Sequence, residues 1–114
     1  MGTPTPTSLA LQYCRKQGYF ADIVERFNCY TNRRNDLYGF IDLIIIDDTQ
    51  MMGVQVTTTS NVNARIKKIK EKRNAEAQRW LATGASIEVW GTDKEGGLRR
   101  TPVVITDLLG ENEI

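Results

Sequence analysis

The sequence predicts an α/β fold in which a mixed β-sheet is flanked by helices, and three observations lead to this prediction. Residues 40–46 form a nearly continuous apolar run, which is typical of a strand that is covered on both faces. Residues 60–82 carry apolar side chains at helical spacing. A further apolar segment follows at residues 86–91. A long helix between strands is a crossover connection, and it implies a mixed sheet with helices packed against it.

The N-terminal part of the chain predicts a helix and then a strand. Thr7 or Ser8 is expected to cap a helix over residues 9–17, and Gly18 is expected to end it. Residues 19–27 are ambiguous. A strand is favoured because β-forming residues dominate and a glycine precedes them, and a helix is the alternative.

The next part predicts a turn-rich segment followed by a β-hairpin. Residues 28–39 are polar and rich in turn-forming residues. The apolar run at residues 40–46 is the clearest strand in the chain, and residues 51–58 form the expected return strand. Residues 47–50, with the sequence DDTQ, are expected to connect the two strands.

The second half predicts one long helix and two strands. Ser60 or Asn61 is expected to cap a helix that runs to about Ala82. Strands are expected at residues 86–91 and 100–106, with a turn between them at residues 93–97. The expected element order of the whole chain is therefore α-β-β-β-α-β-β.

Length and charge set further limits. A chain of 114 residues has the size of one domain, so residues 1–114 are expected to share a single core, with residues 1–7 and 110–114 as flexible ends. The formal net charge is only +1. Any attraction to nucleic acid must therefore come from local clusters of basic residues.

Several classes of chemistry and location are excluded by composition. The chain contains no histidine, which rules out histidine-based triads, HExxH zinc sites and histidine general bases. Its two cysteines, Cys14 and Cys29, are expected to be free thiols. The N-terminus does not resemble a secretory signal, and the longest apolar run is too short to cross a bilayer. A soluble, cytoplasmic protein that makes no membrane contact is expected.

Polar side chains in the middle of the predicted hairpin form the candidate site. Asp42 lies within the apolar strand, and Gln55 and Thr57 share one side of the return strand. If the strands pair across the turn, Asp42 lies near Gln55 and Thr57. A buried carboxylate costs several kcal/mol unless it is paired, protonated or bound to a metal ion.

A strand aspartate, a hairpin, the sequence GVQVT and a basic helix together resemble the PD-(D/E)XK nuclease superfamily, especially its small Holliday-junction-resolvase, VRR-NUC and phage-encoded members. The resemblance covers nearly the whole chain and implies a restriction-endonuclease-like core. Asp42 would be the aspartate of the motif, and Gln55-Val56-Thr57 would occupy the (D/E)-X-K triplet. Glu25 would be the additional acid that an early element supplies. A bacterial or phage-infected host is the implied setting.

The resemblance also implies a metal site and a reaction. One Mg²⁺ or Mn²⁺ ion would be held by Asp42, by the side-chain oxygen of Gln55 and by the carbonyl of Val56, with Glu25 joining through a second ion or a water. The bound ion would lower the pKa of a water and bind the scissile phosphate. Thr57 could orient that water.

The triplet departs from the family pattern at its last position, because Thr57 stands where the family has lysine. A hydroxyl cannot stabilise phosphorane charge as a cation does. A relocated cation could take over this role. The candidates are Lys67 and Lys68, on the first turns of the long helix, and Arg34, which precedes Asp42.

The long helix predicts a surface for phosphate groups. Six basic residues and one acidic residue, Glu71, occur between residues 65 and 73. The six are Arg65, Lys67, Lys68, Lys70, Lys72 and Arg73. Ser60 and Asn61, at the helix start, offer hydrogen bonds that suit a phosphate. A solvated helix face with an ordinary N-cap is the alternative.

The function predicted from these residues is Mg²⁺-dependent hydrolysis of DNA, with branched DNA as one candidate substrate and a homodimer as one candidate assembly. One alternative is a nuclease fold that binds nucleic acid without cutting it. In a structural protein, the other alternative, Asp42 would cap a turn or pair with Arg34. Gln55 and Thr57 would then face solvent, and Glu25 would form a surface salt bridge.

Overall fold

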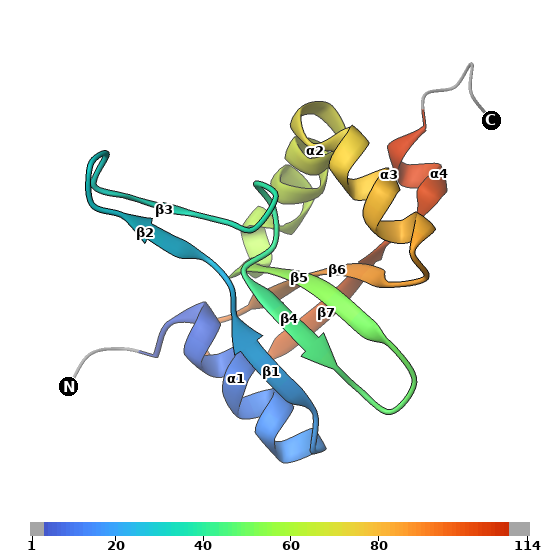
Figure 1. Ribbon diagram of the computed structural model, residues 1–114. Helices are drawn as coiled ribbons and strands as arrows, with labels where there is room; N and C mark the ends of the chain where they lie inside the picture. Colours follow the sequence, from blue (N-terminus) through green and yellow to red (C-terminus); the bar gives the residue numbers. More distant parts are fainter. Residues whose placement is uncertain (1–3, 110–114) are drawn as a thin grey trace.

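The structure, a computed structural model that describes residues 4–109, is built around a five-stranded sheet with the strand order β1-β4-β5-β6-β7 (Figure 1). The strands are β1 (Phe20–Ile23), β4 (Leu43–Ile46), β5 (Met51–Thr58), β6 (Ser86–Thr92) and β7 (Leu98–Val103). β5 and β6 are parallel, and the other neighbouring pairs are antiparallel. The predicted α/β class with a mixed sheet is confirmed, and the architecture is compatible with a restriction-endonuclease-like core.

Helices cover both faces of this sheet (Figure 1). On one face, α1 (Pro6–Gln17) buries Ala10 and Cys14 in one hydrophobic cluster with Val54 and Trp90 of the sheet. On the other face, the helices bury a second cluster against the alternate side chains of β6. These helices are α2 (Val62–Lys72), α3 (Asn74–Ala82) and the short α4 (Ile105–Leu108). The crossover through α2 and α3 is what allows β6 to run parallel to β5.

β5 is the central strand, and its residues 52–57 are all buried. Gln55 is 3% exposed and Thr57 is 5% exposed. The alternative in which these two side chains line a solvent-facing side of the sheet is therefore wrong. Two buried polar side chains on an interior strand need hydrogen-bond partners, which directs attention to their surroundings.

The first helix begins earlier than predicted. Thr5 is the N-cap, and its Oγ1 accepts a hydrogen bond of 3.1 Å from the backbone N–H of Ser8. Pro6 follows in the first turn, where a missing N–H has no cost. Neither Thr7 nor Ser8 is therefore the cap. Residues 6 and 7 of the predicted flexible end 1–7 are helical, whereas residues 1–3 and the predicted flexible end 110–114 lie outside the described residues.

The segment predicted as one strand over residues 19–27 is divided between two sheets. β1 ends at Ile23, and the chain then leaves the main sheet and forms β2 (Arg26–Asn28). β2 pairs with β3 (Arg33–Asn35) in a separate two-stranded sheet. The sequence of β3 is RRN, which has little β-forming character, so its region was predicted as turns alone.

The long helix predicted over residues 60–82 is broken. It begins with a 3-10 helix, η1 (Thr59–Asn61), and is interrupted at Arg73 between α2 and α3. Asn61 occupies the N-cap position of α2, in agreement with the prediction, but its side chain makes no capping hydrogen bond. The Asn61 amide donates to the Thr58 hydroxyl at 3.1 Å instead, and the Ser60 hydroxyl lies 3.3 Å from the same group. Arg73 has a non-helical backbone, with a φ of -130° and a ψ of 27°, and its guanidinium packs against Gly39 of a neighbouring loop.

Three further predictions concern the C-terminal strand, the cysteines and the membrane. The last strand covers Leu98–Val103 and not residues 100–106, because the chain turns into α4 at Ile105. Cys14 and Cys29 are free, as predicted. Within residues 4–109, no helix combines the length and apolar character that crossing a bilayer requires.

Candidate functional site

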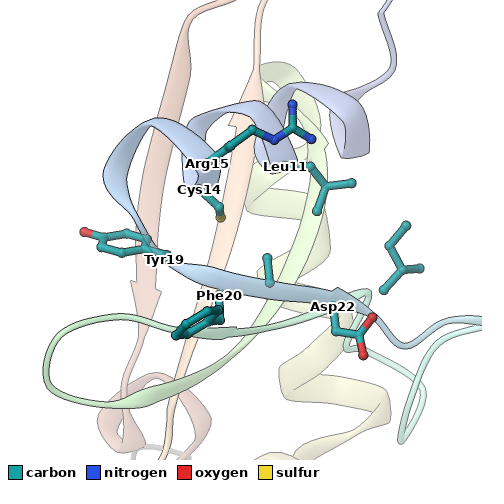
Figure 2. Close-up of a pocket in the computed structure, with 8 residues that line it drawn as sticks. Leu11, Cys14, Arg15, Tyr19, Phe20 and Asp22 are labelled. Atoms are coloured by element: carbon teal, nitrogen blue, oxygen red, sulfur yellow. The ribbon is translucent and has the colours of Figure 1, made fainter.

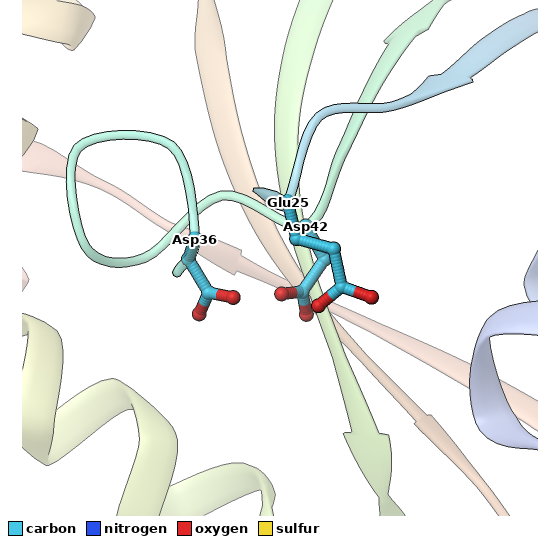
Figure 3. A group of neighbouring side chains, drawn as sticks. All are labelled: Glu25, Asp36 and Asp42. Atoms are coloured by element: carbon cyan, nitrogen blue, oxygen red, sulfur yellow. The ribbon is translucent and has the colours of Figure 1, made fainter. Parts of the chain in front are cut away.

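Three carboxylates, from Glu25, Asp36 and Asp42, come together beside the N-terminal end of β4 (Figure 3). Each contributes one oxygen, and these oxygens all lie within 4.8 Å of one another. Glu25 lies between β1 and β2, Asp36 directly follows β3, and Asp42 directly precedes β4. We call this group the acid cluster.

Backbone hydrogen bonds bring these three segments together. The Val24 N–H donates to the Asp42 carbonyl at 2.9 Å, which fixes Glu25 next to Asp42. Between Asp36 and Asp42 the chain reverses in a tight turn, and the N–H of Leu37 donates to the carbonyl of Ile41 at 2.9 Å. This turn folds Asp36 back toward Asp42. The acid cluster is therefore held by the main chain of three segments.

The Asp42 carboxylate also completes the hydrogen bonding of β5. Its Oδ2 accepts a bond of 2.8 Å from the backbone N–H of Val56. β5 extends beyond the start of β4, so this side chain takes the place of a strand partner. Asp42 is only 8% exposed, and the bond fixes its orientation.

The electrostatics of the acid cluster are unfavourable when every member is ionised. Burial raises the pKa of Asp42 to about 8, and a hydrogen bond to Asp36 acts in the same direction. The negative charges of Asp36 and Glu25 also raise it, whereas the Val56 N–H lowers the pKa. At neutral pH a proton on Asp42 therefore offsets the repulsion, and a bound cation would do the same.

Gln55 reaches the acid cluster through its amide nitrogen. Nε2 donates to Oδ2 of Asp36 at 3.1 Å, so the amide holds a carboxylate in place. Its predicted role as an oxygen ligand stays a prediction. The N–H and the carbonyl of a residue in a strand point to the same side. The Val56 carbonyl, the other predicted ligand, therefore faces the side on which Asp42 lies.

Thr57 lies two residues beyond Gln55, on the same side of β5. It pairs with Gly91 of β6, a glycine against which Thr59 and Val62 pack closely. Within residues 4–109 no hydrogen bond links the Thr57 hydroxyl to the three carboxylates. Its predicted role in orienting water stays a prediction.

Of the three predicted replacement cations, the structure places Arg34 at the acid cluster. Its Nη1 lies 3.0 Å from Oε1 of Glu25, and its side chain is 71% exposed. The alternative pairing of Arg34 with Asp42 is wrong. Lys67 and Lys68 are exposed on α2, and neither forms a salt bridge within the described part of the chain.

The predicted phosphate-binding helix presents its basic residues on the surface. Lys67, Lys68, Lys70 and Lys72 are exposed, and Arg65 is half-buried. Among residues 4–109, Arg73 is the one member of the predicted set that forms a salt bridge, with Glu76 at 3.3 Å. Ser60 and Asn61 are also exposed, so the predicted surface stays open to a ligand.

Asp36 is the site residue that sequence reasoning missed. It lies in a polar stretch where an aspartate is ordinarily a turn former. Its position depends on the turn that follows, in which Tyr38 and Gly39 both have positive φ. The sequence contains one signal for this turn, namely Asp36 and Gly39 just before the apolar run. This signal indicated a turn but did not specify its direction.

A hollow separate from the acid cluster lies between α1 and β1 (Figure 2). Leu11, Cys14 and Arg15 line it from α1, and the other lining residues are Tyr19 and all four residues of β1. Burial raises the pKa of Cys14, so the thiol stays protonated and is a poor nucleophile. The lining offers one carboxylate, from Asp22, and no group of converging acids. The acid cluster is therefore the better candidate site.

Comparisons of the chain with protein-family models, with curated proteins and with solved structures find no significant match. Function is accordingly inferred from the geometry of the acid cluster and its surroundings. Carboxylate oxygens are the donors that Mg²⁺ and Mn²⁺ prefer. Oxygens bound to one such ion are separated by up to about 4–5 Å, given metal–oxygen distances of about 2.0–2.6 Å. The spacing in the acid cluster fits this requirement.

Proposed function

We propose that this protein is a metal-dependent nuclease that hydrolyses phosphodiester bonds in DNA, with Mg²⁺ or Mn²⁺ bound by Glu25, Asp36 and Asp42. The observation that supports the proposal is the acid cluster itself. Three carboxylate oxygens lie within 4.8 Å of one another, and Asp42 is buried. Such an arrangement is costly in the absence of a cation or a proton, and it is typical of sites for hard metal ions.

In this mechanism the neighbouring residues hold and orient the carboxylates that bind the metal ion. Val56 fixes the Asp42 carboxylate through its N–H, and Gln55 fixes Asp36 through its amide. When bound, the metal ion supplies a water of lowered pKa and charge stabilisation for the phosphate. The exposed lysines of α2 attract the phosphate backbone.

Arg34 is the proposed replacement for the lysine of the family pattern. In the structure it pairs with Glu25, at the acid cluster, and most of its side chain is exposed. We propose that the guanidinium moves from Glu25 to the substrate phosphate when Glu25 binds the ion. Lys68 is the second candidate, because it is exposed and forms no salt bridge with a described residue.

A nuclease fold that binds nucleic acid without cutting it is the second candidate function. Thr57 supports it, because it stands at the lysine position and has no hydrogen bond to the acid cluster within residues 4–109. In this case the metal site would stabilise the fold, and the basic helix would bind nucleic acid alone.

Cleavage and metal binding test the proposal together. With Mn²⁺ or Mg²⁺ we expect nicking of plasmid DNA that EDTA abolishes. The variant Asp36→Asn should reduce the cleavage rate by at least about 100-fold. Even the loss of a residue that only hydrogen-bonds to a metal ligand typically reduces metal affinity or activity by about 10–100-fold. Asp48→Asn, in the exposed β4–β5 turn, is the matched control. Equal rates in the two variants would contradict the proposal.

Calorimetry in buffers with different heats of ionisation separates the two candidate functions from a purely structural cluster. Near neutral pH, binding of Mn²⁺ should release close to one proton, because the pKa of Asp42 is raised to about 8. Proton release without cleavage would support the binding-only function. Sedimentation of the same sample tests whether the protein forms the homodimer predicted as one candidate assembly.

A further inference from the structure

The hairpin formed by β2 and β3 extends away from the main sheet as an arm (Figure 1). Its two strands pair with each other, from Arg26 opposite Asn35 to Asn28 opposite Arg33, in a sheet separate from the five-stranded one. Five of the six strand residues of the hairpin are exposed and Asn28 is half-buried, so the surface of the hairpin is open to a partner. We call residues 26–35 the arm.

The arm has the composition of a surface for nucleic acid. Its ten residues include Arg26, Arg33 and Arg34 and no acidic residue, in a chain whose net charge is only +1. It also exposes two aromatic rings, since Phe27 is 61% exposed and Tyr30 is 96% exposed. Arginine for phosphates together with aromatic rings for stacking on bases is the combination that single-stranded nucleic acid requires.

The shape of the tip is fixed by asparagines. Oδ1 of Asn28 accepts hydrogen bonds from the backbone N–H groups of Tyr30, at 2.9 Å, and Thr31, at 3.4 Å. Asn32 has a φ of 55°, a left-handed conformation that asparagine tolerates better than most residues. These features hold the backbone at Tyr30 while its ring stays in solvent. A ring presented in this way is ready to stack on a planar partner.

The arm is joined directly to the acid cluster at both of its ends. Glu25 immediately precedes β2, and Asp36 immediately follows β3. The pair Arg34–Glu25, at 3.0 Å, ties the base of the arm to the cluster. A strand of nucleic acid with one phosphate at the acid cluster would therefore have its neighbouring nucleotides beside the arm.

We infer that the arm grips unpaired nucleotides of a nucleic-acid substrate, with Arg26 and Arg33 on phosphates and Tyr30 stacked on a base. This inference deepens the proposed function. The role of the acid cluster at the base of the arm rests on that proposed function. The arm's affinity for nucleic acid does not require an ion. Stacking on an unpaired base predicts a preference for single-stranded or branched substrates over continuous duplex.

Binding in EDTA tests the arm separately from cleavage. The anisotropy of a labelled single-stranded oligonucleotide is measured as a function of salt. The double variant Arg26→Ala/Arg33→Ala should reduce the slope of log K against log salt by about 1.4, or about 0.7 for each phosphate contact to a single strand. The control, Arg15→Ala/Arg99→Ala, removes the same charge from exposed positions outside the arm and should leave the slope unchanged.

The stacking role is tested at Tyr30. Tyr30→Ala should weaken binding of the single strand by about 5- to 100-fold, as expected for the loss of one stacked base. Tyr30→Phe should restore it, and binding of a continuous duplex should change little in either variant. Because Tyr30 is 96% exposed, none of these changes should alter the melting temperature by more than a degree or two.

The outcomes distinguish this inference from the proposed function. If plasmid is never cut and the arm variants still lose affinity, the nuclease proposal fails and the arm inference stands. If the arm variants bind with the affinity and salt slope of the wild type, the arm inference is overturned whatever the cleavage result. It is also overturned if the variants change self-association in sedimentation and leave binding intact, because the arm would then be a contact between copies.

Discussion

Two groups of charged side chains lie beside the sheet, one on β6 and β7 and the other at the start of β4, and they are balanced in different ways. Near β7, Arg100 donates to both oxygens of Glu88, at 2.7 and 3.0 Å. The indole of Trp90 donates to the same carboxylate at 2.8 Å, and the Arg100 guanidinium lies 5.1 Å from the Trp90 ring centroid. Every charge in this group has a protein partner.

The acid cluster near β1 has no such balance. Three carboxylates share a small space, and the cation that contacts them within residues 4–109, Arg34, is mostly exposed and pairs with Glu25 alone. A proton is then needed on Asp42, whose pKa is raised to about 8. The comparison shows that a closed ion pair satisfies the fold, whereas an open group of like charges is suited to a ligand from solution.

The largest expected difference between the two groups appears when one carboxylate is neutralised in each. Glu88→Gln should lower the free energy of unfolding by about 2–3 kcal/mol, because it leaves the partly buried Arg100 beside a neutral amide. Asp42→Asn should leave stability unchanged or raise it, since the amide oxygen can still accept from the Val56 N–H and the repulsion is removed.

Urea denaturation of both variants in EDTA at about pH 8 measures these effects. A comparable loss of stability in Asp42→Asn would show that the carboxylate charge itself stabilises the fold. The contrast between the two groups would then not hold.

The acid cluster should also make stability depend on pH. The pKa of Asp42 is raised from 3.8 to about 8 in the folded protein, so its stabilisation is complete below the unfolded value and is lost as pH rises through the folded value. Between about pH 6 and pH 8 the loss should reach about 2 kcal/mol, given a limit of about 1.4 kcal/mol per pH unit for one proton.

Thermal unfolding in EDTA across this range measures the effect, and Asp42→Asn is the control because it removes the titrating group. Mn²⁺ should reverse the loss, because the ion takes the place of the proton. If the stability of the wild type and of Asp42→Asn changed with pH in parallel, the group that titrates would be a residue other than Asp42.

A side chain at Gly39 should disturb the turn that positions Asp36. This glycine has a φ of +83°, and a Cβ there would overlap the guanidinium of Arg73. Gly18 has a similar φ of +78°, and a Cβ added there would meet no atom within 4 Å, so Gly18→Ala measures the backbone strain alone. Gly39→Ala should be more destabilising than Gly18→Ala by up to about 1 kcal/mol, because the guanidinium of Arg73, at the end of a flexible side chain that is 45% exposed, must move away.

Mn²⁺ affinity separates a local effect from a global one in the same pair of variants. Gly39→Ala should weaken Mn²⁺ binding, because Asp36 is displaced, and Gly18→Ala should not. Equal affinities would show that the turn does not position the acid cluster.

The sheet and the first members of the site were predictable because they depend on local pattern. The apolar run at residues 40–46 and the pattern of β5 predicted two strands and their connection, although the first strand covers only Leu43–Ile46 and Asp42 lies just before it. The central position of Gln55 and Thr57 followed from the same pattern. The approximate place of Glu25 was predicted from a family resemblance, although it lies between strands and not within one.

The rest could not be predicted because it depends on tertiary contacts. The arm consists largely of polar residues with little β-forming character, and Asp36 reaches the acid cluster through a turn whose φ values the sequence did not specify. The long helix is broken at Arg73, a residue of helix-forming type whose side chain packs against the distant Gly39. Lys68, in contrast, was chosen for its charge alone, and its role stays a prediction.

The smallest expected effect concerns strain in the same turn. Tyr38 has a φ of 53° and precedes Gly39, and the Phe40 N–H donates to the Leu37 carbonyl at 3.2 Å. Two successive residues of positive φ define a turn for which Asn-Gly is the favoured pair. Tyr38→Asn creates this pair and should raise the free energy of unfolding by about 0.5–1 kcal/mol.

Asn32→Tyr, at the tip of the arm, is the reverse exchange at a φ of 55° and should lower stability by a similar amount. Urea denaturation of the two variants measures both effects, and Mn²⁺ affinity should stay unchanged in each. Tyr38 lines a hollow together with Met51 and Trp80, so its ring has contacts of its own. A loss of stability in Tyr38→Asn would mean that the contacts of the Tyr38 ring stabilise the fold by more than the backbone strain at Tyr38 destabilises it.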